Sequence, residues 1–161
     1  MADTTLIMYE AEFKQINEII QKLNREANSK FVFLVDKNGQ LISSAGDTQH
    51  IDTTSLASLT AGNIAATGGL AKILGEKEFS VLFHEGERDN IHISLIGDRV
   101  ILVVVFDNRS SLGLVRLRVK KATDELLNIF NKLLQKVEKE PLAESPFAEI
   151  TDEDIDSLFS E

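Results

Sequence analysis

Apolar residues recur at intervals of three and four in two long stretches of the chain, the pattern of helices that bury one face. The first stretch predicts a helix from about residue 9 to 27, and the second predicts a helix over residues 112–137. Pro141 prevents the second helix from continuing far beyond that point. The apolar positions are Phe13, Ile16, Ile19, Ile20 and Leu23 in the first, and Leu112, Val115, Val119, Ala122, Leu126, Phe130, Leu133 and Val137 in the second.

Another helix is predicted between these two, over residues 52–75. Asp52, Thr53 and Thr54 are candidate N-caps, and Gly75 is the residue type that ends helices in the left-handed conformation. Several apolar side chains of this helix are expected to face a sheet. These are Leu56, Leu59, Leu70, Ile73 and Leu74.

Shorter runs rich in β-branched and aromatic residues predict strands. Two such runs flank Asn38 and Gly39, which are expected to supply the positive φ angles of a tight hairpin turn. Three more follow as "FSVLFHEG", "NIHISLIG" and "RVILVVVFD", and the last two are joined through Gly97 and Asp98. The predicted order of elements is therefore α-β-β-α-β-β-β-α.

Charge divides the chain into a globular domain, residues 1–139, and an acidic tail, residues 140–161. The tail holds eight acidic residues and no Lys or Arg, so it carries most of the formal net charge of −9. The domain is nearly neutral, which argues against nucleic-acid binding and against electrostatic attachment to an anionic membrane. We therefore expect protein partners.

The acidic tail has the pattern of a short docking helix over residues 152–159. Thr151 suits an N-cap, and Ile155, Leu158 and Phe159 fall on one face at i, i+3 and i+4. A helix this short is marginal in isolation, so it needs a groove to complete it. Two interpretations of this segment stay open. In the first it docks on a partner protein; in the second it docks on its own domain or is disordered.

No self-contained active site, metal site or cofactor site is predicted. A G-x-x-x-x-G-K-[ST] phosphate loop is absent, so the chain is not expected to bind nucleotide. The chain has no Cys, and its three His lack metal-ligand spacing. His92 alternates with two isoleucines and is interpreted as a structural residue on the polar face of a strand. The longest aliphatic run, residues 100–106, is too short to span a membrane, and no leader is recognised, so a cytoplasmic protein is expected.

Several long segments resemble the Roadblock / dynein light chain family. They are "FLVDKNGQLISSAG", "IDTTSLASLTAGNIAA", "GGLAKILGE" and "VVVFDNRSSLGLVRLRVKKA", and the likeness extends to the terminal "SPFAEI" and "DIDSLF". The resemblance implies a three-layer α/β module with a central five-stranded, mainly antiparallel sheet, working as a homodimer. It also implies a cytoplasmic protein that is concentrated at a cell pole in some members.

The family likeness extends to function through its bacterial members. It implies a GTPase-activating protein for a Ras-like GTPase of the MglA type, in bacterial cell polarity and gliding motility. GTP and Mg²⁺ would then belong to the GTPase, and the activator would reposition the catalytic groups of the GTPase. A noncatalytic Roadblock scaffold that recruits polarity or motor components is the alternative.

Small residues give the middle helix a smooth face. Ala61, Ala65 and Gly69 fall at i, i+4 and i+8, and small side chains permit the close approach of another backbone. One interpretation is a crowded seam between this helix and its own sheet. The family resemblance favours a dimer or partner interface instead, made by Ala61, Ala65, Gly68, Gly69 and Lys72.

Arg109, in the predicted loop "FDNRSSLG", is the candidate for an arginine finger. Such an Arg can raise the rate of GTP hydrolysis by about 10³ to 10⁵. The favoured interpretation is a surface Arg paired with Asp107, because the family is thought to act without a finger.

A basic set lies in the last predicted helix. It is interpreted as the solvated side of that helix, with a second option that the tail folds back and its carboxylates meet the set. Its members are Arg116, Arg118, Lys120 and Lys121.

Overall fold

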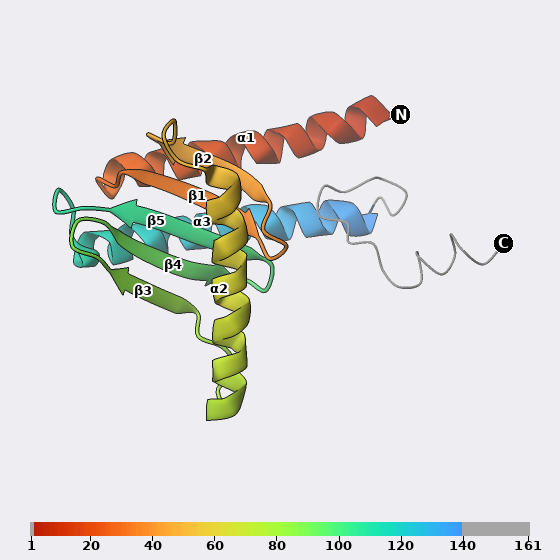
Figure 1. Ribbon diagram of the computed structural model, residues 1–161. Helices are drawn as coiled ribbons and strands as arrows, with labels where there is room; N and C mark the ends of the chain where they lie inside the picture. The colour runs from red at the N-terminus through yellow and green to blue at the C-terminus, as the bar shows by residue number, and fades with distance from the viewer. Residues whose placement is uncertain (1, 140–161) are drawn as a thin grey trace.

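A computed structural model describes residues 2–139 and shows three layers (Figure 1). Five strands form one antiparallel sheet in the order β2-β1-β5-β4-β3. Helices α1 and α3 lie side by side on one face of the sheet, and α2 crosses the other face (Figure 1). The elements are α1 (Ala2–Glu26), β1 (Phe31–Asp36), β2 (Leu41–Gly46), α2 (Thr53–Leu74), β3 (Val81–Glu85), β4 (Asn90–Ile96), β5 (Val100–Phe106) and α3 (Leu112–Lys139). The predicted order and the five-stranded antiparallel sheet are confirmed.

Two core clusters lie on opposite faces of the sheet. Because side chains alternate between faces along a strand, β1 sends Val32 and Leu34 toward α1 and α3 and sends Phe33 and Val35 toward α2. The cluster under α1 and α3 is the larger and includes Ile16, Ile20, Leu23, Val115, Val119, Leu126 and Leu133. The two long helices therefore bury the faces that their apolar spacing predicted, apart from Val137, whose side chain lies outside the described part of the structure.

The β1–β2 turn differs from the predicted one. Gly39 has a φ of 88°, as expected, but Asn38 does not adopt a positive φ. The carboxylate of Asp36 accepts the backbone N–H groups of Asn38 at 2.9 Å and Gln40 at 3.0 Å, so this side chain shapes the turn. A Cβ on Gly39 would lie 3.2 Å from the Cα of Ser58, which shows that the turn packs closely on α2.

His92 lies in the interior, as a structural residue can, but the strand face predicted to be polar is a buried one. Its side chain is 2% exposed, on the face of β4 that packs under α3. Burial lowers the pKa of His92, and the nearby positive charge of Arg116 lowers it further. The alternation with Ile91 and Ile93 correctly placed His92 opposite those residues. The mistake arose because helices cover both faces of this sheet, and strand periodicity alone does not reveal the second cover.

A candidate partner-binding surface on helix α2

Helix α2 begins and ends where its sequence predicted. The Asp52 carboxylate accepts the backbone N–H of Ser55 at 3.0 Å and its hydroxyl at 2.6 Å. Both hydrogen bonds lower the pKa of the Asp52 carboxyl, and the one from the Ser55 hydroxyl contributes more. At the other end Gly75 adopts a φ of 79° and closes the helix in the left-handed conformation.

Only one side of α2 packs on the sheet. Ala57, Thr60 and Ala71 are buried, and Leu56 and Ile64 contact the core cluster under this helix. With about 3.6 residues per turn, these five residues occupy one narrow sector of the helix. The prediction that Leu56 faces the sheet is confirmed.

Four other apolar residues of α2 are exposed, contrary to the prediction that they face the sheet. The exposed fractions are 72% for Leu59, 59% for Leu70, 83% for Ile73 and 68% for Leu74. Figure 1 shows the reason, because α2 crosses the strands and continues past the short edge strand β3. Near the end of the helix the sheet therefore leaves Leu70, Ile73 and Leu74 exposed, although Ala71 is still buried. Leu59 is exposed because it lies outside the sector of the helix that packs on the sheet. We call these four residues the apolar stripe.

The small residues of α2 lie in a different sector, beside the apolar stripe. Ala65, Gly69 and Lys72 are exposed, and Ala61 and Gly68 are half-buried. A Cβ added at Gly68 or Gly69 would meet nothing within 4 Å. Gly68 and Gly69 are therefore not small in order to fit against the sheet. We call the set Ala61, Ala65, Gly68, Gly69 and Lys72 the small stripe. Their role as an interface stays a prediction.

The apolar stripe had a signal in the sequence that the prediction did not use. Apolar residues are distributed around α2, so the helix has no consistently polar face. A helix of this kind is normally covered on more than one side. Within residues 2–139, no element covers the side of α2 that carries the apolar stripe.

Arg109 is not part of this surface. It lies in the connection between β5 and α3, where its guanidinium forms an ion pair with Asp107. The pairing raises the pKa of Arg109 and lowers that of Asp107, chiefly through their side-chain hydrogen bonds. The interpretation of Arg109 as a paired surface residue is confirmed. Arg109 also lines a cavity of about 420 Å³ with Ser29, Lys30, Phe31, Asp47, His50 and Ile51.

Apart from Lys72, the exposed side chains of α2 are apolar or small and are suited to contact with another protein. Across residues 2–139, no group of three or more His, Asp or Glu side chains is placed to hold a metal ion. No helix in the same range is long and apolar enough to cross a membrane. The predicted tail anchors Ile155, Leu158 and Phe159 lie outside the residues that the structure describes.

Comparisons with known proteins agree with this fold. Residues 15–106 match the model of the Roadblock/LC7 domain. MglB from Myxococcus xanthus is 66% identical, with 74% of this chain and 90% of that chain aligned and a TM-score of 0.73. The gliding protein MglB from Thermus thermophilus is 33% identical, with coverage of 76% and 93% and a TM-score of 0.71.

One further solved structure is similar to this chain, and one comparison found nothing. A structure described as MglB with a tetrameric arrangement is 32% identical, covers 76% of this chain and 92% of its own, and has a TM-score of 0.72. A comparison with curated protein sequences found no match. The domain match, the high identity to MglB and the shared order of elements together show that the chain belongs to the Roadblock/LC7 family.

Proposed function

We propose that this protein is a homodimeric GTPase-activating protein for a Ras-like GTPase of the MglA type, in bacterial polarity and motility. The observation that carries the proposal is the uncovered face of α2, in a chain 66% identical to Myxococcus xanthus MglB. A contiguous exposed apolar face is typical of a site that binds another protein. The cell pole is the proposed site of action.

The two stripes of α2 suit two different contacts. The apolar stripe offers four large side chains, the composition typical of permanent interfaces between identical subunits. The small stripe offers little side-chain area but permits close backbone approach, and Lys72 adds one positive charge at its end. We assign the apolar stripe to the second copy of the chain and the small stripe to the GTPase.

Activation would come from positioning. Lys72 is the one charged residue of helix α2. The helix therefore offers no carboxylate or His as a general base and no second cation. A close-fitting rigid surface can instead hold a mobile loop of the GTPase in its reactive conformation, which raises the rate by orienting groups that the GTPase already carries. GTP and Mg²⁺ belong to the GTPase in this scheme, and the activator needs no cofactor.

The acidic tail would supply a second contact with the GTPase. Ile155, Leu158 and Phe159 form one apolar face in the predicted tail helix, suited to a groove on a partner. Burying Leu158 and Phe159 contributes roughly 1.5 to 3 kcal/mol each, before the cost of ordering the tail. The tail would therefore add to affinity, while the dimer provides the activating surface.

Single-turnover GTP hydrolysis by the GTPase, with and without this protein, tests the proposal. We expect a faster hydrolysis step that saturates with concentration of the protein. The noncatalytic scaffold is the competing function, and it predicts binding to the GTPase or to other polarity proteins with an unchanged rate. A measured binding constant with no acceleration would therefore favour the scaffold.

A further inference from the structure

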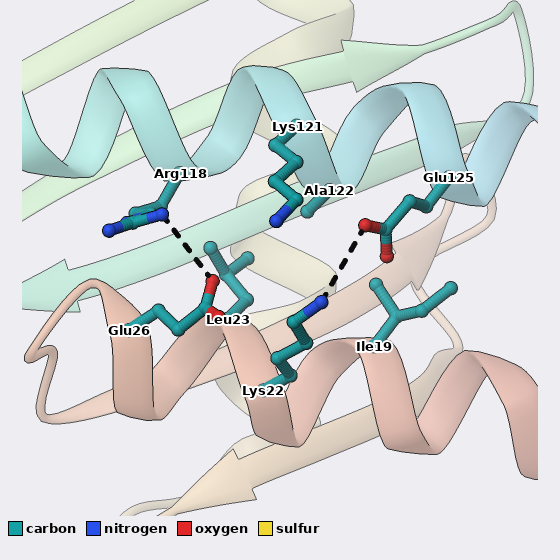
Figure 2. Close-up of a pocket in the computed structure, with 8 residues that line it drawn as sticks. All are labelled: Ile19, Lys22, Leu23, Glu26, Arg118, Lys121, Ala122 and Glu125. Atoms are coloured by element: carbon teal, nitrogen blue, oxygen red, sulfur yellow. Dashed lines mark ion pairs between the residues drawn. The ribbon is translucent and has the colours of Figure 1, made fainter.

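Ion pairs cross the outer seam between α1 and α3. Arg118 Nη1 lies 3.8 Å from Glu26 Oε2, and Lys22 Nζ lies 3.9 Å from Glu125 Oε1 (Figure 2). A third pair joins Glu12 and Lys136. The seam has an apolar floor, with Leu23 and Ala122 between the first two pairs and Ile19 beyond the Lys22–Glu125 pair (Figure 2). The seam is thus a shallow groove with charged walls.

Two cations on this side of α3, Lys121 in the groove and Lys132 further along the helix, have no acidic partner among the described side chains. Lys121 extends between the two ion pairs in Figure 2, is exposed, and forms no ion pair with any residue that the structure describes. Lys132 is also exposed and lacks an acidic partner among the side chains of residues 10–136. It lies about three turns further along α3, on the same side as Lys121 and about 16 Å away along the helix axis.

Arg118, which lines the groove, has a buried hydrogen-bond donor that also lacks a partner among the described residues. The Nε atom of Arg118 is buried and finds no hydrogen-bond acceptor within the described part of the chain. A buried polar group without a partner is costly, so an acceptor that reaches it stabilises the protein. Lys121, Lys132 and Arg118 together leave the groove short of carboxylates.

We infer that the acidic tail of the same chain, residues 140–161, folds back and docks along this groove. The tail begins where α3 ends, and Lys121 lies about 27 Å back from Lys139 along the helix. An extended chain covers that distance in about eight residues. Residues 148–161, which hold six of the eight acidic residues of the tail, therefore reach both Lys121 and Lys132.

The chemistry of the tail matches the groove in charge. Its carboxylates pair with Lys121 and Lys132, and its apolar side chains cover Leu117, which is 61% exposed on α3. Attachment to α3 keeps the tail at a high effective concentration, in the millimolar range for a short flexible linker. Weak contacts are then sufficient, and salt weakens them because the cations are exposed.

Docking in the groove and docking on the GTPase use the same segment of the chain. The groove therefore holds the tail until a GTPase competes for it. The inference does not rest on GTPase activation, because the groove and the tail belong to one chain. It is tested with this protein alone.

Paramagnetic relaxation in the full-length protein tests the inference. The chain contains no Cys, so Ser160→Cys gives a single site for a nitroxide label near the end of the tail. We expect amide signals around Lys121 and Lys132 to lose intensity, and signals of α2 to keep theirs. The loss should disappear at an ionic strength of about 1 M, where the screening length is about 3 Å.

A charge-reversed pair and a matched control locate the contact. Lys121→Glu with Lys132→Glu should restore most of the lost intensity. Lys37→Glu with Lys77→Glu, which makes the same change in net charge at two exposed positions elsewhere, should leave the loss in place.

Two outcomes would overturn the inference. One is an intensity pattern that is the same in both double variants, or that is centred on α2. The other is signal loss in an isotope-labelled, spin-free chain mixed with a spin-labelled, unlabelled chain to the same extent as within one chain. That result would place the tail on a second copy.

Discussion

The Nε atom of Arg109 donates to both carboxylate oxygens of Asp107, at 3.0 Å and 3.2 Å. The loop is further held by Asn28, whose amide donates to the Arg109 carbonyl at 2.6 Å. An arginine finger has to extend a free guanidinium into the site of another protein. Arg109 is instead directed at its own loop.

We therefore expect Arg109→Ala to lower the stimulation of GTP hydrolysis by less than about tenfold, against about 10³ or more for the loss of a true finger. Asp107→Asn is the control, because it weakens the ion pair and leaves the guanidinium in place. The measurement is single-turnover hydrolysis at saturating activator, with binding measured separately. A drop of a thousandfold with binding intact would make Arg109 a finger.

The two stripes of α2 should separate dimerisation from GTPase binding. Ile73→Ala removes a side chain that the proposed dimer buries, at a cost of roughly 1.5 to 3 kcal/mol, so the dissociation constant of the dimer should rise by about tenfold or more. Sedimentation equilibrium measures the change. A dimer of unaltered affinity would remove Ile73 from the subunit interface.

Ala65→Arg should disrupt GTPase binding and leave the dimer unchanged. The side chain of Ala65 is exposed in the monomer, so the substitution leaves the fold intact, but it inserts a long charged group where close approach is needed. We expect the solution mass to stay the same while GTPase binding is lost. Gly69→Arg should behave in the same way. If either variant is monomeric and still binds the GTPase, the assignment of the two stripes is reversed.

The glycines should differ in what a methyl group does to stability. Gly62 lies inside α2 with nothing within 4 Å of an added Cβ, so Gly62→Ala should raise the free energy of unfolding by about 0.5 to 1 kcal/mol. Gly46 has a φ of 96°, and its Cβ would lie 2.4 Å from the Lys30 carbonyl oxygen. Gly46→Ala should therefore lower the free energy of unfolding. Denaturant unfolding of both variants checks the contrast.

Buried His92 should make stability depend on pH. Its pKa in the folded protein is below the ordinary value of 6.5, so the unfolded chain binds the proton more readily. The stabilisation from neutral His92 is complete above pH 6.5 and is lost as the pH falls from there toward the lowered pKa of the folded state. His92→Leu should flatten the free energy of unfolding across that range. The exposed His50 supplies a control, and an equal slope in His50→Gln and in His92→Leu would contradict this account.

The tail should affect the interaction with the GTPase more than the fold of the domain. Removing residues 145–161 should weaken GTPase binding or alter nucleotide exchange, while the truncated protein still dimerises and stimulates hydrolysis at high concentration. Leu158→Ala with Phe159→Ala should reproduce most of that loss, because these side chains supply the predicted apolar contact. Asp152→Asn with Asp156→Asn should mainly make association less sensitive to salt. Unchanged affinity, exchange and hydrolysis after truncation would leave the tail without a role on the GTPase.

Local signals were sufficient for most of the fold. Intervals of three and four placed α1 and α3, runs of β-branched and aromatic residues placed the strands, and Asp52 and Gly75 marked the ends of α2. These features depend on residues close together in the chain, so they can be recognised without knowledge of what packs on them. The pairing of Arg109 with Asp107 belongs to the same class, because the two residues are two positions apart.

The sequence by itself determined which segments are helices and strands, where α2 is capped, and that acidic charge gathers in residues 140–161. Tertiary structure decided what covers each element. It placed His92 under α3, left Leu59, Leu70, Ile73 and Leu74 without a cover, and set Lys121 beside a groove between two helices distant in sequence. Periodicity shows which side chains share one face of a helix or strand. Whether that face is buried depends on the width of the sheet and on the angle at which a helix crosses it. Those quantities arise only when the layers pack.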